Sequence, residues 1–450
     1  MQYKIVKLLF ILFVLFAWFA WFAVNLQALS LEEAEKLALS ASPELRKYNL
    51  IEENNSLKEK GDLFNRLPSL GSLRVSGESD LKDTVQGTLS LPSSISATLW
   101  DGGVYSITKQ LNAITSESTK NSVLQAYYDV LSGVATSYYD VLEAQTTLEN
   151  AKADLENQEI NWEKAEVQYQ SKMLGQGDYL QAEFDYADAK TALNKAGRDL
   201  AAKKTVLQKL LGLSEDLPEL SDINFDAYID FLQTLAAYDD AAIASLKTKL
   251  LSLVQTRNPG FLNAGLNLKQ SELGLKQAQT GYMPNFQASF SFPSPSVNLN
   301  TTDINNNSVL QWSKMSLGIS GSISLDFWKT ANSVARSKNS LAQQQIDYQS
   351  TVDQLDTDVY NAIISLINNA TSVVSTERAL EIRQIQYDSA EALYNLGQYS
   401  SLDLSEARIN FNQSQAASNT ARYSFLKQLA TIRGLAAFNT MPELVSFISK

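Results

Sequence analysis

Apolar and polar positions divide the chain into long helical stretches and short alternating ones. From about Val104 to Lys172, and again from Ala331 to Leu396, the chain has no proline and few glycines. A helix of this length extends about 100 Å at a rise of 1.5 Å per residue. Apolar residues spaced for a packed seam occur in the first stretch at Val130, Val134, Tyr138, Val141, Leu142 and Leu148. The pattern predicts that each long helix packs along its whole length against partner helices.

Shorter helical stretches flank the long ones. Residues 43–66 have apolar positions at roughly helical spacing, and Pro68 ends the segment. After the turn at Leu174–Gly177, another stretch extends from Asp178 to Gly212. Together these two stretches, about 60 residues, nearly match the long helix in length. We therefore expect one long helix antiparallel to two shorter helices in each half of the chain.

Two further stretches in each half alternate with period two. Their apolar positions are Leu73, Val75, Val85, Leu89 and Leu91 in the first half, and Phe286, Ala288, Phe290, Phe292, Met315, Leu317, Ile319, Ile323 and Leu325 in the second. Such runs of about ten residues, apolar on one face and Ser-rich on the other, fit strands with one side in lipid and the other in water. Bacterial transmembrane barrels begin at about eight strands, and an open sheet edge in lipid leaves backbone groups unpaired. The four strands must therefore share a barrel with other copies of the chain.

The two halves share landmarks at constant offsets, which indicates an internal duplication. Ser42-Pro43 and Leu67-Pro68 recur 216 positions later as Asn258-Pro259 and Met283-Pro284. Further on, an offset of 225 relates Asp101 to Asp326, Ala165-Glu166 to Ala390-Glu391, Tyr169 to Tyr394, Asp178 to Asp403, and Ala182 to Ala407. The second half thus holds nine extra residues. The Asn-rich stretch Asn298–Asn307 predicts a longer loop between strands at that place.

The amino terminus has the pattern of a secretory signal. Lys4 and Lys7 precede an apolar run from Leu8 to Val24, and a peptidase could cut after Ala28. An uncleaved anchor is the alternative, because the run nearly reaches the roughly 18 residues of a membrane helix. The predicted division is a signal peptide at 1–28, a first repeat at 29–213, a linker with a small helix at 214–245, a second repeat at 246–436, and a tail at 437–450.

Composition excludes several classes of function. The 450 residues include no Cys and no His, so thiol nucleophiles, His-based triads, disulfides and the usual zinc ligands are absent. Lys and Arg total 37 against 49 Asp and Glu, a net charge of -12, which argues against a nucleic-acid partner. There is no Gly-rich phosphate loop either. We therefore expect neither catalysis nor a cofactor.

A set of short motifs occurs in order over residues 31–436. They are Leu31-Glu32-Glu33-Ala34, Ser42-Pro43-Glu44-Leu45, the Leu67-Pro68 and Met283-Pro284 exits, Trp100-Asp101-Gly102-Gly103, and Leu402-Asp403-Leu404-Ser405-Glu406-Ala407. No single motif is specific, but their repeated order resembles the TolC family of outer-membrane efflux proteins. The resemblance implies a mainly α fold with β, in which long antiparallel helices form a periplasmic helical barrel. That barrel joins a transmembrane β-barrel shared by a homotrimer, with four strands per chain.

The resemblance also implies a function and partners. The chain would be the exit duct, in the outer membrane and extending into the periplasm, of a tripartite efflux or type I secretion system. It would contact outer-membrane lipid and pass small molecules or proteins from an inner-membrane transporter that is joined by a periplasmic adaptor (membrane fusion) protein. The alternative is a periplasmic coiled-coil adaptor or scaffold without a pore. Such a protein should lack paired strands with lipid-like faces.

Four residues are candidates for a gate at the periplasmic end: Asp403, Glu406, Tyr394 and Asp178. Asp403 and Glu406 lie three apart at a helix start, so both project from one face, although Ser400 with Asp403 also fits a capping box. For Tyr394 and Asp178 the resemblance implies closing contacts. Asp178 could instead cap a helix, and Tyr394, like Tyr169, could simply pack in a seam.

Glycines and aromatic residues mark the turns and corners. Gly175, Gly177 and Gly397 are candidate turn tips for adaptor docking, and Asp101, Gly102, Gly103 and Asp326 are candidate strand–helix junctions. Trp100, Trp312 and Trp328 lie at or beside predicted strand ends, where indole rings often mark a membrane interface. One departure from the family stands out: Tyr399 occupies the position after Gly397-Gln398 where relatives with a characterised closed state have an arginine. Lys172 or another base would have to replace it.

Overall fold

The protein is described by a computed structural model that covers residues 28–69, 74–80, 84–90, 94–292, 296–298 and 315–449, with the backbone alone for 74–80, 84–90 and 296–298. Most of the predicted signal peptide, Leu73, Leu91, Trp312 and nearly all of the predicted loop Asn298–Asn307 lie outside these residues. In chain order the elements are α2 (Leu31–Ala41), α3 (Pro43–Phe64), β1 (Arg74–Asp80), β2 (Thr84–Ser90), β3 (Ser94–Trp100), α4 (Val104–Gln170), α5 (Gln176–Leu211), η1 (Phe225–Tyr228), α6 (Ile229–Ala236), α7 (Asp240–Arg257), α8 (Pro259–Gln279), η2 (Thr280–Tyr282), β4 (Asn285–Ser291), β5 (Ser296–Asn298), β6 (Ser316–Ser322), α9 (Phe327–Asn395), α10 (Ser401–Leu435) and α11 (Met441–Ile448).

The described residues divide into two compact units. One, the hairpin unit, comprises residues 28–46, 124–258 and 355–449, and the other, the strand unit, comprises 47–123 and 259–354. The long helices α4 and α9 contribute residues to both units.

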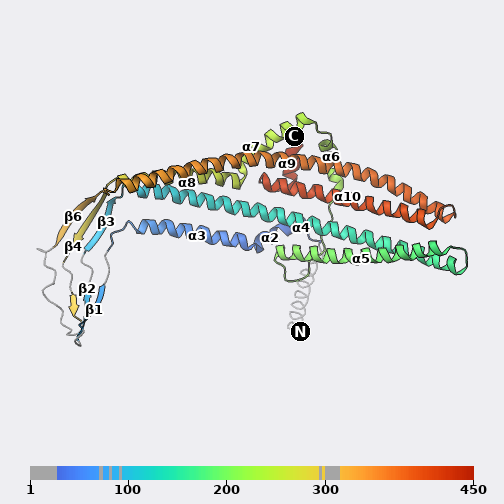
Figure 1. The fold of residues 1–450 in the computed structure, drawn as a ribbon, viewed down its shortest axis with the longest axis horizontal. Helices are drawn as coiled ribbons and strands as arrows, with labels where there is room; N and C mark the ends of the chain where they lie inside the picture. Colours follow the sequence, from blue (N-terminus) through green and yellow to red (C-terminus); the bar gives the residue numbers. More distant parts are fainter. Residues whose placement is uncertain are drawn as a thin grey trace, which may run out of the picture. The chain divides into compact units, whose positions relative to one another are not determined.

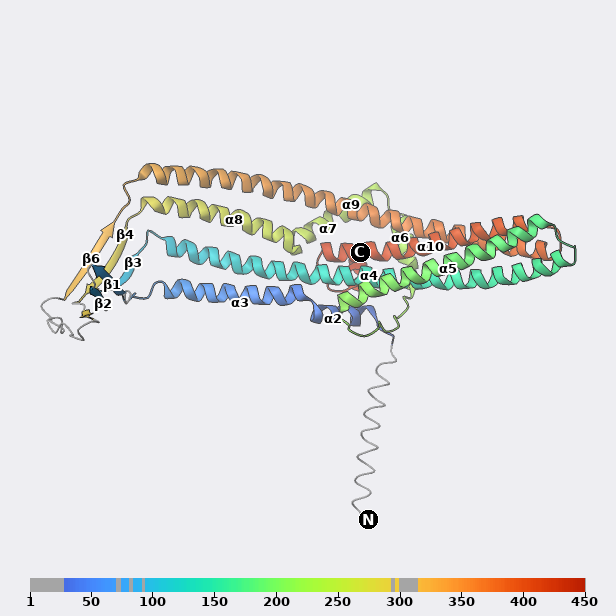
Figure 2. The same ribbon diagram turned by 60° about the horizontal axis from the view of Figure 1, so that its bottom comes forward.

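Two helical hairpins, α4 with α5 and α9 with α10, make up most of the hairpin unit (Figures 1 and 2). The buried positions of α5 are Ala182, Asp185, Ala189, Ala196, Leu200, Leu207 and Leu211. Their spacing of three, four and seven residues is that of a coiled-coil seam, and small Ala side chains let neighbouring helices approach closely. The predicted packing of a long helix along a shorter antiparallel one is confirmed for both hairpins.

Away from the helical turns, the amino-terminal segment and the linker pair with each other and contact α4. Leu29 forms a parallel bridge with Leu220, and the Tyr138 hydroxyl lies 2.8 Å from both the Leu29 and the Ser221 carbonyl oxygens. A buried ion pair adds a second tie, because Arg433 Nη2 donates to Glu35 Oε2 at 2.9 Å. These contacts bring α2, α4 and α10 together.

The strand unit contains two three-stranded antiparallel sheets, in the orders β1-β2-β5 and β3-β4-β6. Its helical part has a small core of Ile114, Leu266 and Leu273. In the second sheet, Phe290 pairs with Ile95 on one side and with Leu317 on the other, whereas Ser289 pairs with Ser96 and Gly318. Period-two alternation therefore gives this sheet one apolar face and one face of Ser, Thr and Gln, as the sequence pattern predicts.

The number of strand segments differs from the sequence prediction. Two strands are expected in each half, but the described residues contain six segments. The sequence has Pro92 between β2 and β3, and Pro293 and Pro295 between β4 and β5. Proline has no N–H to give to a ladder, so it interrupts strands. Since β2 pairs with β5 and β3 pairs with β4, the two interrupted strands still run side by side.

Candidate functional site

The first turn joins α4 to α5. Lys172, two residues after the end of α4, has a left-handed backbone with φ of 58°. Gly175 then takes the N-cap position of α5 with φ of −70°, and it has no side chain to accept from the first amides of the helix. Gly177 lies within the first turn of α5. The left-handed step of the turn is therefore made by a lysine, and neither predicted glycine uses a conformation reserved for glycine.

The second turn joins α9 to α10 and is built differently. Here Gly397 makes the left-handed step, with φ of 73°. Ser400 takes the N-cap position of α10: its hydroxyl accepts from the Asp403 amide at 3.3 Å, and Asp403 Oδ2 accepts from the Ser400 amide at 2.9 Å. The predicted capping box of Ser400 and Asp403 is confirmed. The reciprocal hydrogen bonds fix the start of α10.

Asp178 joins the two hairpins. It is the third residue of α5. The interpretation that it caps this helix is wrong, because the N-cap residue is Gly175 and no side-chain capping hydrogen bond forms there. Instead, Asp178 Oδ1 accepts from the Ser401 hydroxyl at 2.8 Å. Ser401 is the first residue of α10, so this bond links α5 to the other hairpin. Burial of the Tyr394 phenol and then the charge of Asp178 raise the pKa of Tyr394.

The two acids at the start of α10 are both exposed. Hydrogen bonds from the hydroxyl and from the amide of Ser400 hold the pKa of Asp403 below its ordinary range. Asp403 therefore remains ionised at neutral pH while it closes the capping box. Glu406 lies one helical turn further on, in the next exposed position.

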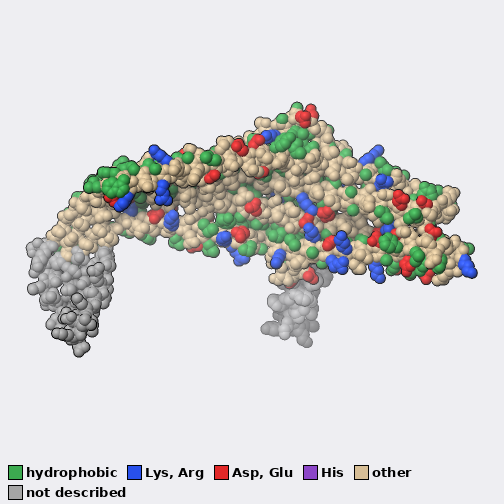
Figure 3. All heavy atoms as spheres, viewed as in Figure 1, with side chains coloured by type: hydrophobic (Ala, Val, Ile, Leu, Met, Phe, Trp, Pro, Cys, Tyr) green, Lys and Arg blue, Asp and Glu red, His purple; other side chains and the backbone are tan. Residues whose placement is uncertain are grey.

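Apolar side chains are exposed around the same turns. Met173 is 82% exposed, Leu396 is 72% exposed and Leu402 is 61% exposed. In the space-filling view, acidic and hydrophobic side chains lie beside one another at the turn end of the hairpin unit (Figure 3). Tyr169 and Tyr179 stack on each other across the first turn, with ring centroids 4.8 Å apart. Exposed apolar groups of this kind are typical of protein–protein contact sites.

The first strand–helix junction lies in the strand unit and depends on three residues. The Asp101 carboxylate accepts from the Gly103 amide at 3.2 Å and from the Tyr105 amide at 2.9 Å, so it caps α4. Gly102 and Gly103 have φ of 70° and 93°. A Cβ on Gly102 would also lie 3.0 Å from Met283 Cβ. Both glycines therefore have a left-handed backbone at the bend between β3 and α4.

The second junction has a different capping arrangement. Asp326 precedes α9, its amide donates to Ser324 Oγ at 3.4 Å, and its carboxylate pairs with Lys329 one turn later. Trp100 is the last residue of β3 and Trp328 is the second residue of α9, and both are exposed. Trp100 therefore lies at a strand end, as expected, whereas Trp328 lies in the first turn of α9, beyond the end of β6 at Ser322.

The chemistry available at the turns is that of hydrogen bonds, carboxylates and apolar contact surface. Within the described ranges, no group of three or more His, Cys, Asp or Glu side chains is arranged to hold a metal ion. None of the helices that the structure describes combines the length and apolar character required to cross a membrane.

Several solved structures of membrane proteins have a similar fold. CusC matches with a TM-score of 0.73 and 17% identity, covering 90% of this chain and 91% of its own. The CmeC outer membrane channel of Campylobacter jejuni matches with a TM-score of 0.72 and 15% identity, covering 93% of this chain and 89% of its own. The outer membrane protein VceC of Vibrio cholerae matches with a TM-score of 0.70 and 16% identity, covering 90% of this chain and 96% of its own.

The sequence itself points to the same class. Residues 250–437 match the family model of the outer membrane efflux protein. The chain is therefore similar to the TolC-like outer membrane efflux proteins in fold and, over residues 250–437, in sequence. No curated protein matches it in sequence. The mainly α fold with β that the sequence motifs imply is confirmed.

The predicted gate residues of the chain are only partly brought together. Asp178 and Tyr394 lie close enough to interact, and Asp178 also accepts from the Ser401 hydroxyl. The Asp403 carboxylate accepts a hydrogen bond from Ser400 within its own turn, and Glu406 is exposed. Ser401 is not among the residues that the sequence pattern predicts for the gate. A serine after a predicted N-cap serine gives no signal of its own, since either residue could cap the helix.

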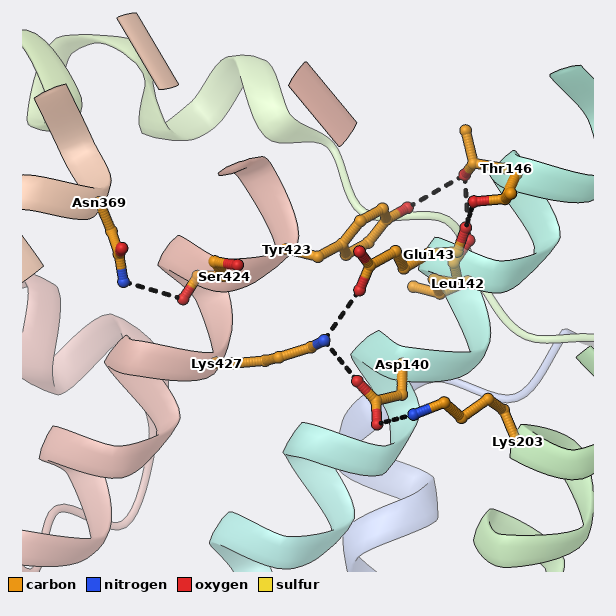
Figure 4. A network of polar contacts seen from close by, with 10 residues as sticks. Asp140, Leu142, Glu143, Thr146, Lys203, Asn369, Tyr423, Ser424 and Lys427 are labelled. Carbon is orange, nitrogen blue, oxygen red and sulfur yellow. Dashed lines mark hydrogen bonds and ion pairs between the residues drawn. The ribbon is translucent and has the colours of Figure 1, made fainter. Parts of the chain in front are cut away.

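A charged network between α4, α5 and α10 was also missed (Figure 4). Lys427 donates to Glu143 at 2.8 Å and pairs with Asp140, which also accepts from Lys203 at 2.8 Å. Burial acts to raise the pKa of Asp140, but the hydrogen bonds from Lys203 and Lys427 outweigh burial, so the pKa is lowered overall. Burial likewise opposes the charge of Lys427, and hydrogen bonds to Asp140 and Glu143 raise its pKa. Asp140 and Lys427 therefore stay ionised at neutral pH, and the network ties the two hairpins together.

Proposed function

We propose that three copies of this chain form the outer-membrane exit duct of a tripartite efflux or type I secretion system. The strand units share one transmembrane barrel in outer-membrane lipid, and the hairpin units form a helical tube in the periplasm. A periplasmic adaptor docks at the turns that contain Gly175, Gly177 and Gly397. An inner-membrane transporter then delivers small molecules or proteins to the duct.

The two-sided sheet β3-β4-β6 carries this proposal. Its apolar face, which includes Phe290 and Leu317, suits lipid, and its Ser-rich face suits a water-filled interior. Among the described residues, β6 pairs along one edge only, with β4. Unpaired backbone groups within a bilayer cost several kcal/mol each. A strand from a second copy of the chain would satisfy this edge, which a soluble adaptor or scaffold has no need to do.

Arginine substitution on the two sheet faces tests the proposal. Phe290→Arg or Leu317→Arg should block barrel insertion, because a cation facing lipid near mid-bilayer costs about 2–4 kcal/mol. The matched controls Ser289→Arg and Ser316→Arg place the same charge one residue away on the opposite face and should be tolerated. Insertion is measured as trimer recovered from the outer-membrane fraction. Equal recovery of all four variants, or a water-soluble monomer without detergent, would contradict the duct.

The exposed acids at the start of α10 are proposed to line the periplasmic constriction. Three copies of Asp403 and Glu406 place six carboxylates around one axis. Clustered carboxylates favour cations over anions, so the pore should be cation-selective and multivalent cations should block it from the periplasmic side. In planar bilayers, the double variant Asp403→Ala and Glu406→Ala should lose both properties. If selectivity and block stay unchanged in that variant, the constriction lies elsewhere.

A further inference from the structure

A small polar cavity lies between the two hairpins of the hairpin unit. The residues that line it come from all four helices and include Gln158, Asp185, Tyr394, Ser405 and Arg408. Its volume is about 20 Å³. A cavity of this size holds about one water molecule and has no room for an organic ligand.

Arg408 is the centre of a buried ion cluster at this cavity. Its Nη1 lies 3.1 Å and 2.9 Å from the two carboxylate oxygens of Asp154, and its Nη2 lies 3.4 Å from Asp185 Oδ1. The side chains of Arg408 and Asp185 are 6% and 7% exposed. Because Asp154 belongs to α4 and Asp185 to α5, one cation of α10 binds both helices of the other hairpin. Without the guanidinium, two like charges would remain buried together, which is strongly unfavourable.

Two polar atoms of the cavity residues have no hydrogen-bond partner among the described protein atoms: Arg408 Nε and Ser405 Oγ. Both residues are more than nine-tenths buried. The guanidinium N–H is a donor, and the serine hydroxyl both donates and accepts. The N–H disfavours a bound cation, and the two nearby carboxylates disfavour an anion. A neutral molecule of the size of water, able to accept from Nε and to bond with Oγ, satisfies both atoms.

We propose that the cavity is a water site, and that Arg408, Asp154, Asp185 and this water form a latch that ties the start of α10 to the α4–α5 hairpin. Its consequence for export rests on the proposed function: in the duct, the latch holds the periplasmic constriction narrow. Arg408 supplies a positive charge near the second turn, which the uncharged Tyr399 cannot supply. Lys172, the other candidate, is an exposed residue of the first turn.

The Lys427 network offers a contrast with this latch, because it joins the same three helices (Figure 4). The Lys427 side chain is 25% exposed, so water can reach Asp140 and Glu143 when the lysine is removed. The side chains of Asp154 and Asp185 are only 14% and 7% exposed, so water should reach them less readily when Arg408 is removed. Loss of Arg408 should therefore release the start of α10, whereas loss of Lys427 should not.

Hydrogen–deuterium exchange of the full-length, detergent-purified protein tests the latch without any transport assay. Arg408→Met should speed exchange of the amides of residues 401–408 by about tenfold or more, since an unpaired buried acid pair favours local opening. Lys427→Met, the matched control, should change the same amides by less than about threefold. If Arg408→Met fails to fold, Arg408→Lys serves instead: it keeps the charge, loses the forked contacts, and should give an intermediate rate. Unchanged exchange at residues 401–408 in the variant that folds would overturn the latch.

Two further measurements separate the water, the latch and the export function. A high-resolution map should show one ordered molecule within hydrogen-bond distance of both Arg408 Nε and Ser405 Oγ; an empty cavity would overturn the water site. In planar bilayers, Arg408→Met should raise the conductance of the pore several-fold over wild type. Faster exchange with unchanged conductance would overturn the gating consequence of the latch. A wild-type protein that forms no pore would instead contradict the proposed function, and the exchange result would still decide the latch.

Discussion

The two helical turns place an aspartate at the same position, yet the two carboxylates bind different partners. Asp403 accepts from Ser400 within its own turn, whereas Asp178 accepts from Ser401 of the other hairpin. The difference originates three residues earlier, where one turn has Ser400 and the other has Gly175 at the N-cap. A serine engages the acid in a capping box, and a glycine leaves the acid free. The residue at the cap therefore decides whether the aspartate acts within a helix or between hairpins.

The left-handed positions of the two turns should give the largest difference. Gly397→Lys should lower the stability of the hairpin unit by about 1–2 kcal/mol, because a side chain disfavours the left-handed backbone. No atom lies within 4 Å of a Cβ built on Gly397, so the cost is conformational and not steric. Lys172→Gly should be neutral or stabilising by up to about 1 kcal/mol, since strain relief is offset by glycine's chain entropy. Thermal melting of the purified protein measures both.

A control for these variants is available in the first turn. Gly177 has a helical backbone and open space around it, so Gly177→Ala should raise stability by about 0.5–1 kcal/mol. If Gly397→Lys melts at the same temperature as wild type, the left-handed step does not limit the second turn.

Exchanging the cap residues should convert one turn into the other. Ser400→Ala should cost about 1 kcal/mol, the usual loss for an N-cap, and should speed amide exchange at the start of α10. Gly175→Ser should do the reverse at α5, because the new Cβ would lie 3.5 Å from Asp178 Oδ2 and bring the hydroxyl into capping range. The capped Asp178 would then release Ser401. Slower exchange at α5 without any change at α10 would mean that the cap residue does not control the link.

The long helices were predictable because their signals are local. Val104 was the predicted start of the first long helix and is its observed start, and the predicted end at Lys172 lies two residues beyond Gln170. The absence of proline and a regular apolar seam are sufficient to predict where such a helix begins and ends. The capping box of Ser400 with Asp403 was equally predictable, because its two residues lie within one helical turn of each other in the sequence.

The contacts between hairpins were not predictable in the same way. Asp178 has the sequence context of a cap, and only the folded chain brings it to Ser401, 223 positions away. Arg408 and Asp154 are likewise 254 positions apart, and neither interrupts the helical pattern around it. A charged residue in a seam resembles one on a solvated face until its neighbours are known. The site therefore depends on long-range pairing, for which a single sequence carries no signal.

Removing the carboxylate at each turn should have unlike consequences. Asp178→Ala should cost about 0.5–1.5 kcal/mol through the lost hydrogen bond to Ser401, and should loosen one hairpin against the other. Asp403→Ala should instead affect only the first amides of its own helix. A pair of spin labels, one on each hairpin, should report a broader distance distribution for Asp178→Ala than for Asp403→Ala. Identical distributions would show that Asp178 does not join the hairpins.

The smallest expected effect is on the titration of Tyr394. Its pKa is raised first by burial and then by the charge of Asp178, so its folded-state pKa lies above the unfolded value. Stability from this residue is thus fully present below the ordinary tyrosine pKa of about 10 and is lost as pH rises through the folded-state value. Asp178→Asn should lower the pKa of Tyr394 but leave it raised, because burial remains, whereas Asp403→Asn should leave it unchanged. The titration is followed as phenolate absorbance, taken as the difference between each protein and its Tyr394→Phe counterpart. Equal shifts of the Tyr394 pKa in the two asparagine variants would contradict the proposed difference between the two turns.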